Sequence, residues 1–108
     1  FNGIVDPQEF MSELDFSKVR EVHVAGGVEH RGFKLDVHSR LCSEATLAFA
    51  RQALEAAADS VEVVTYEILP EAVPVLGIEA VCRELERLQQ ALIHPWTSHP
   101  SNVSCIAL

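Results

Sequence analysis

Two short stretches rich in β-branched residues, separated by a long Ala-rich stretch, constrain the fold of this chain more than any other feature of its sequence. Residues 19–25 alternate polar and apolar side chains with the period of two that is typical of a strand, and residues 61–68 are typical of a buried strand. Between them, Ser43 is a favoured helix N-cap, and the apolar residues that follow it at helical spacing are Leu47, Ala50, Leu54, Ala57 and Ala58. Two strands joined through a helix form a β/α unit with parallel strands. The sequence therefore predicts an α/β fold.

The flanking segments extend this pattern. Asp6 and Pro7 begin a short helix, and a second extended segment lies at residues 35–38. The residues of a longer amphipathic helix are Ile78, Val81, Cys82, Leu85, Leu88 and Leu92. A parallel sheet needs helices on both faces or closure into a barrel, and this length supplies about three or four of the eight units of a barrel. We therefore expect residues 1–93 to be the C-terminal part of a (β/α)8 TIM-like barrel, cut from a longer protein, and residues 94–108 to be an irregular tail.

Composition restricts the partners and the compartment. The net charge of -8 over 108 residues argues against nucleic acid, because affinity for a phosphate backbone depends on clustered Lys and Arg. No apolar run is long enough to span a membrane and no signal peptide is apparent, so we expect a cytoplasmic protein with no membrane partner. Cys42, Cys82 and Cys105 are odd in number and widely spaced, which fits reduced, buried thiols rather than a disulfide framework.

Four side chains that can bind a metal fall near the ends of the predicted strands: His23, Asp36, His38 and Glu67. In a β/α barrel the chemistry is carried out at the C-terminal ends of the strands. Two imidazoles with two carboxylates suit Fe, Mn or Zn, and two His with one carboxylate is the pattern of non-heme iron oxygenases. Each His would bind as the neutral imidazole, with its second ring nitrogen oriented by an acceptor such as Glu21 or a backbone carbonyl.

The strand period also predicts where these side chains point. Glu21 and His23 share one face of the first strand, and Val22 and Val24 lie on the other. Glu67 shares a face with Val63 and Thr65 and lies at the C-terminal end of an apolar strand. A carboxylate at that position costs several kcal/mol if it is buried without a partner. The alternative is that each His is a hydrogen-bonded rim residue, and for His30, His94 and His99 a solvated imidazole is the default interpretation.

Three runs of residues resemble a known family: R-E-V-H-V-A-G-G at 20–27, L-D-V-H-S at 35–39 and V-V-T-Y-E-I-L-P at 63–70. They resemble the multinuclear non-heme iron-dependent oxidative enzymes, the class that includes the iron oxidase of methanobactin biosynthesis, and the resemblance covers residues 1–92. It implies a xylose-isomerase-like TIM barrel that uses two or three iron ions and dioxygen to modify cysteines of a ribosomally made precursor peptide. By analogy, His23 matches the strand-end His of the family, Asp36 and His38 its D-x-H pair, and Glu67 its late strand-end Glu.

The chain departs from the family pattern at two places. The family usually has a second His where this chain has Gly27, and the Asp of its usual E-W-D pattern is absent after Glu67, where Ile68 follows. Its remaining metal ligands come from the first half of the barrel. The resemblance therefore implies that this chain alone holds at most part of a multi-iron site and has little or no activity.

Three functions remain open on the sequence. The first is the C-terminal portion of an iron-dependent oxidase acting on the Cys residues of a precursor peptide, with no organic cofactor and no separate catalytic residue assigned. The second is a non-catalytic half-barrel that self-associates, binds a partner protein or joins the missing half-barrel, since an isolated half exposes sheet edges and apolar surface. The third is a fragment of a sugar-isomerase-like enzyme that uses Mn or Mg, for which the two His fit less well.

Overall fold

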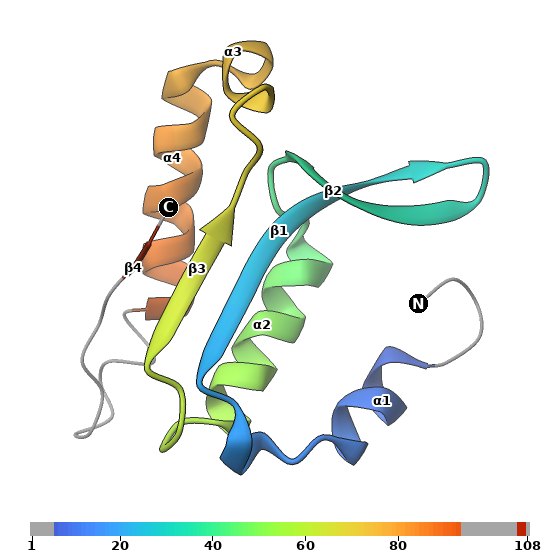
Figure 1. Ribbon diagram of the computed structural model, residues 1–108, viewed down its shortest axis with the longest axis vertical. Helices are drawn as coiled ribbons and strands as arrows, with labels where there is room; N and C mark the ends of the chain where they lie inside the picture. The colour runs from blue at the N-terminus through green and yellow to red at the C-terminus, as the bar shows by residue number, and fades with distance from the viewer. Residues whose placement is uncertain (1–5, 94–105, 108) are drawn as a thin grey trace.

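The computed structural model describes residues 6–93 and 106–107, which form a mixed α/β fold (Figure 1). The four strands lie in one sheet in the order β2-β1-β3-β4. The elements are α1 (Pro7–Glu13), the 3-10 turn η1 (Phe16–Lys18), β1 (Glu21–His30), β2 (Phe33–Arg40), α2 (Glu44–Ala56), β3 (Val63–Glu67), α3 (Ala72–Leu76), α4 (Ile78–Leu88), the π-helical turn η2 (Gln89–Ile93) and β4 (Ile106–Ala107). No helix in the described ranges is long and apolar enough to cross a membrane.

The predicted β/α unit is present. β1 and β3 pair in parallel, with His23 opposite Thr65 and Ala25 opposite Glu67, and α2 connects them. The Ser43 hydroxyl caps α2 by accepting a hydrogen bond from the Thr46 backbone N–H at 3.1 Å. The sequence prediction of two parallel strands joined through an Ala-rich helix is therefore confirmed.

β1 and β2 instead form an antiparallel hairpin, so the expectation of parallel strands is wrong for this pair. β1 continues through Gly26 and Gly27, although two consecutive glycines are typical of a loop, and the chain turns at Arg31 and Gly32, whose φ angles are 50° and 82°. Positions 26 and 27 both require glycine because the backbone of β2 packs directly against them. A Cβ atom at Gly26 would lie 1.8 Å from the Arg40 carbonyl oxygen, far inside van der Waals contact.

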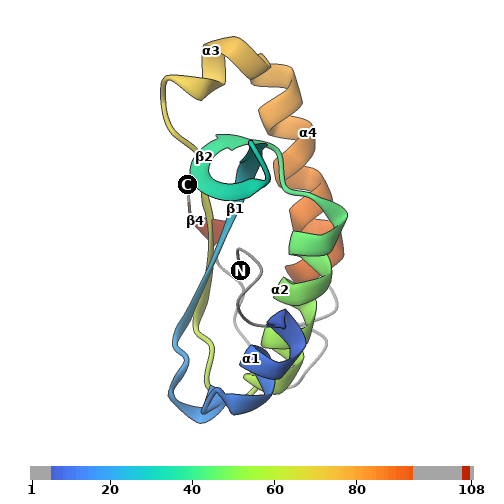
Figure 2. The ribbon, with the colours of Figure 1, turned by 90° about the vertical axis from the view of Figure 1, so that its right-hand side faces the viewer.

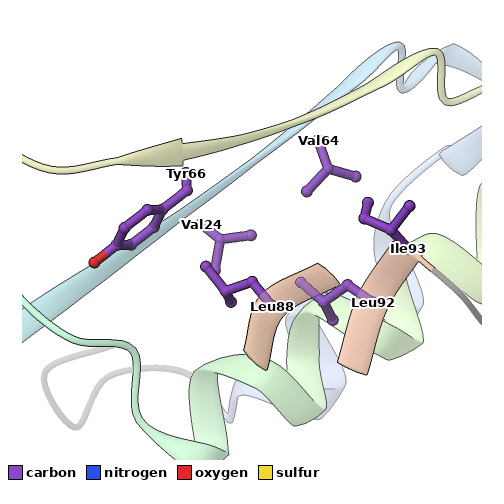
Figure 3. A pocket seen from close by; sticks show the side chains of 6 residues that line it. All are labelled: Val24, Val64, Tyr66, Leu88, Leu92 and Ile93. Atoms are coloured by element: carbon purple, nitrogen blue, oxygen red, sulfur yellow. The ribbon is translucent and has the colours of Figure 1, made fainter. Parts of the chain in front are cut away.

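One face of the sheet carries the core. Val24, Val64 and Tyr66 point from β1 and β3 toward α2, α4 and η2. Figure 3 shows these three side chains around a small apolar cavity, whose remaining lining residues are Leu88, Leu92 and Ile93. Burial of this face supplies the hydrophobic stabilisation of the fold, and it confirms the predicted alternation in both strands.

The opposite face of the sheet has no helix over it in the described ranges. Figure 2 shows α2 and α4 on one side of β1 and β3 only. The uncovered face carries Glu21, His23, Thr65 and Glu67, all exposed or half-buried. A parallel pair of strands normally has both faces covered, so this face is the natural place for a site or for further structure.

α4 departs from the predicted apolar stripe. Cys82 is exposed, which corrects the prediction that it is buried, and Leu85 is only half-buried. Glu84 is buried instead, with 4% of its surface exposed. Its Oε1 accepts a hydrogen bond from the Cys42 backbone N–H at 2.7 Å. From the sequence, a glutamate in an amphipathic helix is expected on the solvent-exposed face. The burial of Glu84 is explained only by the packing of α4 against the segment after β2, where the Cys42 backbone N–H is its partner.

Arg87 neutralises the buried carboxylate. Its Nε donates to Glu84 Oε2 at 2.9 Å, and its remaining nitrogens donate to the Cys42 carbonyl and to Glu44 at the start of α2. Burial, followed by the charge of Glu84, raises the pKa of the Cys42 thiol to about 12, so this free thiol is protonated and inert at neutral pH. Glu84 and Arg87 thus tie α4 to the segment between β2 and α2.

Most of the expected irregular tail, residues 94–105 and 108, lies outside the described residues, as does Cys105. Within the tail, Ile106 and Ala107 form β4, which pairs in parallel with Val64 and Thr65 of β3. This pairing closes one edge of β3.

Replacing Arg87 with Ala should lower the free energy of unfolding by about 3 kcal/mol or more, because the substitution leaves the Glu84 carboxylate buried without its cation. The matched control is Arg83→Ala, which removes an arginine of the same helix whose exposed pair with Glu79 spans 3.8 Å and should contribute about 0–1 kcal/mol. Urea unfolding of both variants measures the difference. Equal losses would show that Glu84 is not held as a buried charge.

Candidate metal centre

The centre of the site lies on the uncovered face of the sheet. Because β1 and β3 are in register, His23 and Glu67 project from the same face of adjacent strands. The His23 Nδ1 atom lies 2.9 Å from Glu67 Oε1. Sheet geometry alone therefore brings together two of the four residues that the sequence singled out.

His38 reaches the same carboxylate from a bulge in β2. Gly26 lies opposite Arg40 and Val28 lies opposite Leu35, so residues 36–39 have no direct partner in the register of β1 and arch out of the ladder. Within the bulge, His38 has a φ of 48°, in the left-handed region that few residues with a side chain adopt. Backbone outliers of this kind are concentrated at functional sites, where surrounding contacts enforce them.

Three contacts hold His38 in place beyond the bulge. Its carbonyl oxygen accepts a hydrogen bond of 2.8 Å from the backbone N–H of Leu69, which follows β3 by two residues. Its Nδ1 atom lies 3.2 Å from Glu67 Oε2, and its Nε2 atom lies 2.8 Å from Asp36 Oδ1. The backbone contact ties the β2 bulge to the end of β3 and so fixes His38 beside Glu67.

The four predicted residues thus form one connected group. Each oxygen of Glu67 faces one imidazole, and Asp36 contacts His38 on its solvent side. The side chain of His38 is 28% exposed, whereas that of Asp36 is 80% exposed. The group therefore runs from a partly buried centre at Glu67 and His38 to an open rim at Asp36.

Glu21 and Thr65 complete the surroundings of His23. Glu21 Oε1 lies 3.0 Å from His23 Nε2, which is the orienting role that the sequence suggested for this carboxylate. Thr65 donates its hydroxyl hydrogen to the same oxygen. Thr65 was not predicted as part of the site, although the strand alternation that placed it on the face of Glu67 was the available signal.

These hydrogen bonds change the acidity of the site. The Thr65 hydroxyl, followed by His23, lowers the pKa of Glu21, because both favour the ionised carboxylate. Glu21, followed by Glu67, raises the pKa of His23 above 6.5, because two carboxylates favour the imidazolium. Without a metal, the site therefore favours a proton on His23.

The donor atoms of the site are imidazole nitrogens and carboxylate oxygens. In residues 6–93 no three His, Cys, Asp or Glu side chains converge on one point as a ready-made metal cluster, and the imidazole nitrogens of His23 and His38 instead lie 2.9 and 3.2 Å from the carboxylate oxygens of Glu67. A cation that replaced the shared protons would meet imidazole nitrogen and carboxylate oxygen, the donors suited to Fe, Mn and Zn. Glu21 and Asp36 then stand where outer carboxylates orient ligating imidazoles.

The glycine at position 27 has a structural explanation. A Cβ atom there would lie 2.7 Å from the Leu35 carbonyl oxygen, so a side chain cannot be added unless β2 shifts. The His that the resembling family usually has at this position is therefore incompatible with the hairpin as it is packed here.

One comparison with known proteins gives a match. A family model described as RiPP precursor modification enzyme MbnB/TglH/ChrH matches residues 1–92, which include all four predicted site residues. No curated protein and no solved structure matches the chain.

The His23 imidazole should titrate with a midpoint above 6.5 in the metal-free protein, and Glu21→Gln should lower that midpoint by removing its strongest partner. A raised folded-state pKa means that the stability contributed by His23 is fully present below pH 6.5 and is lost as the pH rises through the folded value. Imidazole NMR signals report the midpoint directly. A midpoint at or below 6.5, or one that Glu21→Gln leaves in place, would contradict the hydrogen bonding described.

Proposed function

The chain belongs to the RiPP precursor modification enzyme family of MbnB, TglH and ChrH, and on this premise we propose that it is the C-terminal portion of a non-heme iron-dependent oxidase that modifies cysteines of a ribosomally made precursor peptide with dioxygen. One observation carries the proposal: Glu67 lies between the imidazoles of His23 and His38, with one carboxylate oxygen facing each. Two imidazoles and one carboxylate are the ligand combination of the non-heme iron oxygenases.

The uncovered sheet face supports the barrel interpretation. In a (β/α)8 barrel the helices cover the outside and the inner face of the parallel strands meets the other strands, with the reacting groups at the C-terminal ends. Here the helices lie on one face of β1 and β3, and Glu67 is the last residue of β3 on the other face (Figure 2). We propose that residues 1–93 are part of such a barrel and that the remaining strands complete it. The free thiols of Cys42 and Cys82 suit a cytoplasmic location.

The metal ligands in this proposal are His23, His38 and Glu67, with Asp36 at the rim and Glu21 orienting His23. When bound, iron supplies activation of dioxygen and an open position for the thiolate of a substrate cysteine. The donor set also suits Mn or Zn. This chain then holds part of a site of two or three irons, and the other ligands come from the missing half of the barrel.

The residues of the chain control the protons of the site. A His must be neutral to bind a metal, so His23 has to lose the proton that Glu21 and Glu67 favour. Thr65 holds the Glu21 carboxylate in place by donating to it, and the ionised Glu21 can accept a hydrogen bond from the second nitrogen of a neutral His23. The same carboxylates that retain the proton therefore orient the imidazole once the proton is gone.

Peptide modification is better supported than the sugar-isomerase alternative, because the matching family is described by its action on a precursor peptide. Association is a second property that a specific observation favours. The uncovered face of a parallel sheet is a surface that a second copy, a partner protein or the missing half-barrel would cover.

Anaerobic titration with ferrous iron should give weak, substoichiometric binding that is lost when either His23 or His38 is changed to Ala, because each substitution removes a nitrogen donor facing Glu67. Asp36→Asn should weaken binding only partly, by about 10–100-fold, as for a residue that orients a ligand. The matched control is His30→Ala, an exposed imidazole on the same hairpin. Calorimetry and metal analysis measure the effect, and a loss for His30→Ala equal to that for His38→Ala would exclude the assigned ligands.

The affinity for ferrous iron should fall with decreasing pH, beginning at a pH above 6.5, because the raised pKa of His23 lets protons compete earlier than at an ordinary imidazole. Glu21→Gln should move this fall toward lower pH. Binding isotherms between about pH 6 and 8 test the shift, and an affinity that does not change over this range would contradict a metal bound through His23.

The isolated chain should elute from a size-exclusion column as a dimer or larger species at micromolar concentration, because its sheet face is uncovered and one sheet edge is exposed. Light scattering gives the mass independently of shape. A monodisperse monomer would mean that the uncovered face is stable in water and would count against a partial barrel.

A further inference from the structure

The hairpin arm, residues 28–40, projects from the helix-covered part of the molecule (Figure 1). It consists of the end of β1 and all of β2, and β2 is one of the two outer strands of the sheet in the described residues, the other being β4. An outer strand presents backbone N–H and C=O groups that can pair with another extended chain. The arm is therefore a surface on which an extended segment could be added to the sheet.

The arm has one apolar face. The antiparallel register places His30 opposite Phe33 and Val28 opposite Leu35, and directly opposed residues share a face of the sheet. Phe33 is 58% exposed and Leu35 is 41% exposed. Side chains of an added strand would pack against these two residues, so the arm offers apolar contacts as well as backbone pairing.

The charge of the arm is opposite to that of the rest of the chain. The arm contains three of the eight Lys and Arg residues, namely Arg31, Lys34 and Arg40, and only two of the sixteen Asp and Glu residues. The remainder carries five basic residues against fourteen acidic ones. An acidic segment would therefore be attracted to the arm and repelled from the rest of the surface.

The arm also leads into the metal centre, because Asp36 and His38 belong to the same strand as Phe33 and Leu35. The regular part of β2 ends at Leu35, so a strand paired near Phe33 ends at the bulge of residues 36–39 that carries His38. A segment bound along β2 would place the residues that follow it beside Glu67.

We propose that the outer edge of β2 binds an extended, acidic segment of the peptide substrate by strand addition, with apolar side chains of the peptide on Phe33 and Leu35 and its carboxylates near Arg31 and Arg40. The identity of the partner rests on the proposed function, in which the substrate is a peptide. The binding mode does not rest on it, because it depends on the arm and not on a metal. Strand addition gives affinity through main-chain hydrogen bonds and selectivity through alternate side chains.

The test uses a fluorescent peptide of about ten residues that alternates Val and Glu, and a matched peptide with Lys in place of Glu. The chain should bind the acidic peptide at least about tenfold more tightly at low salt, and Arg31→Glu should reduce that preference. Phe33→Ser should weaken binding about tenfold, because it removes an aromatic contact from an exposed position. Fluorescence anisotropy measures each affinity, and an unchanged urea midpoint shows that Phe33→Ser remains folded.

Backbone methylation tests strand addition itself. Of two peptides methylated on alternate amide nitrogens, only one set of amides faces β2, so one peptide should lose binding and the other should keep it. Equal binding by both peptides, or no effect of Phe33→Ser, overturns the proposal. A dimer that Phe33→Ser dissociates and that excludes the peptide also overturns it, because a second copy would then be the occupant of the edge.

The experiment separates this proposal from the proposed function. His23→Ala should abolish iron binding and leave peptide affinity unchanged, because His23 lies on the sheet face away from the arm's Phe33 and Leu35. Peptide binding by a chain that never binds iron would support the docking edge and refute the oxidase. If His23→Ala lost peptide affinity, the proposal that the arm binds the peptide independently of the metal centre would be overturned.

Discussion

The structure of the site depends on the Glu67 carboxylate, whose two oxygens each face one imidazole. A carboxylate at the end of an apolar strand needs partners, and here it finds them on two other strands. His23 comes from β1 through parallel pairing, and His38 comes from the β2 bulge. The same side chains are the metal ligands that we propose. One interaction therefore joins the three strands at the point where the proposed chemistry takes place.

The backbone is arranged to allow this meeting. Gly26 and Gly27 let β2 approach β1 more closely than any side chain would permit, and the bulge that follows places His38 with a φ of 48°. The hydrogen bond from Leu69 to the His38 carbonyl then attaches the bulge to the end of β3. Glu84 and Arg87 fix the segment after β2 by contacts to both backbone groups of Cys42. Packing of α4 is thereby coupled to the position of the site.

Period-two alternation predicted which side chains share a face within each strand, and the parallel register of β1 and β3 in the structure then places His23 and Glu67 on the same face. It could not predict the route of the chain between residues 26 and 35. Two glycines are typical of a loop, and only the contact between them and the backbone of β2 shows that they belong to a hairpin. The burial of Glu84 was equally hidden, since its partner Cys42 is 42 residues away in the sequence. Local patterns thus predicted the strands, whereas long-range backbone packing determined how β2 brings His38 to the site.

The most direct test of a single metal centre around Glu67 is to follow the imidazole NMR signals of all His residues during a titration with zinc, which suits the same donors and is diamagnetic. We expect His23 and His38 to respond together at one stoichiometry while His30 does not, and Glu67→Gln to abolish the joint response. Separate responses of His23 and His38, or a joint response that survives Glu67→Gln, would contradict a single metal centre around Glu67.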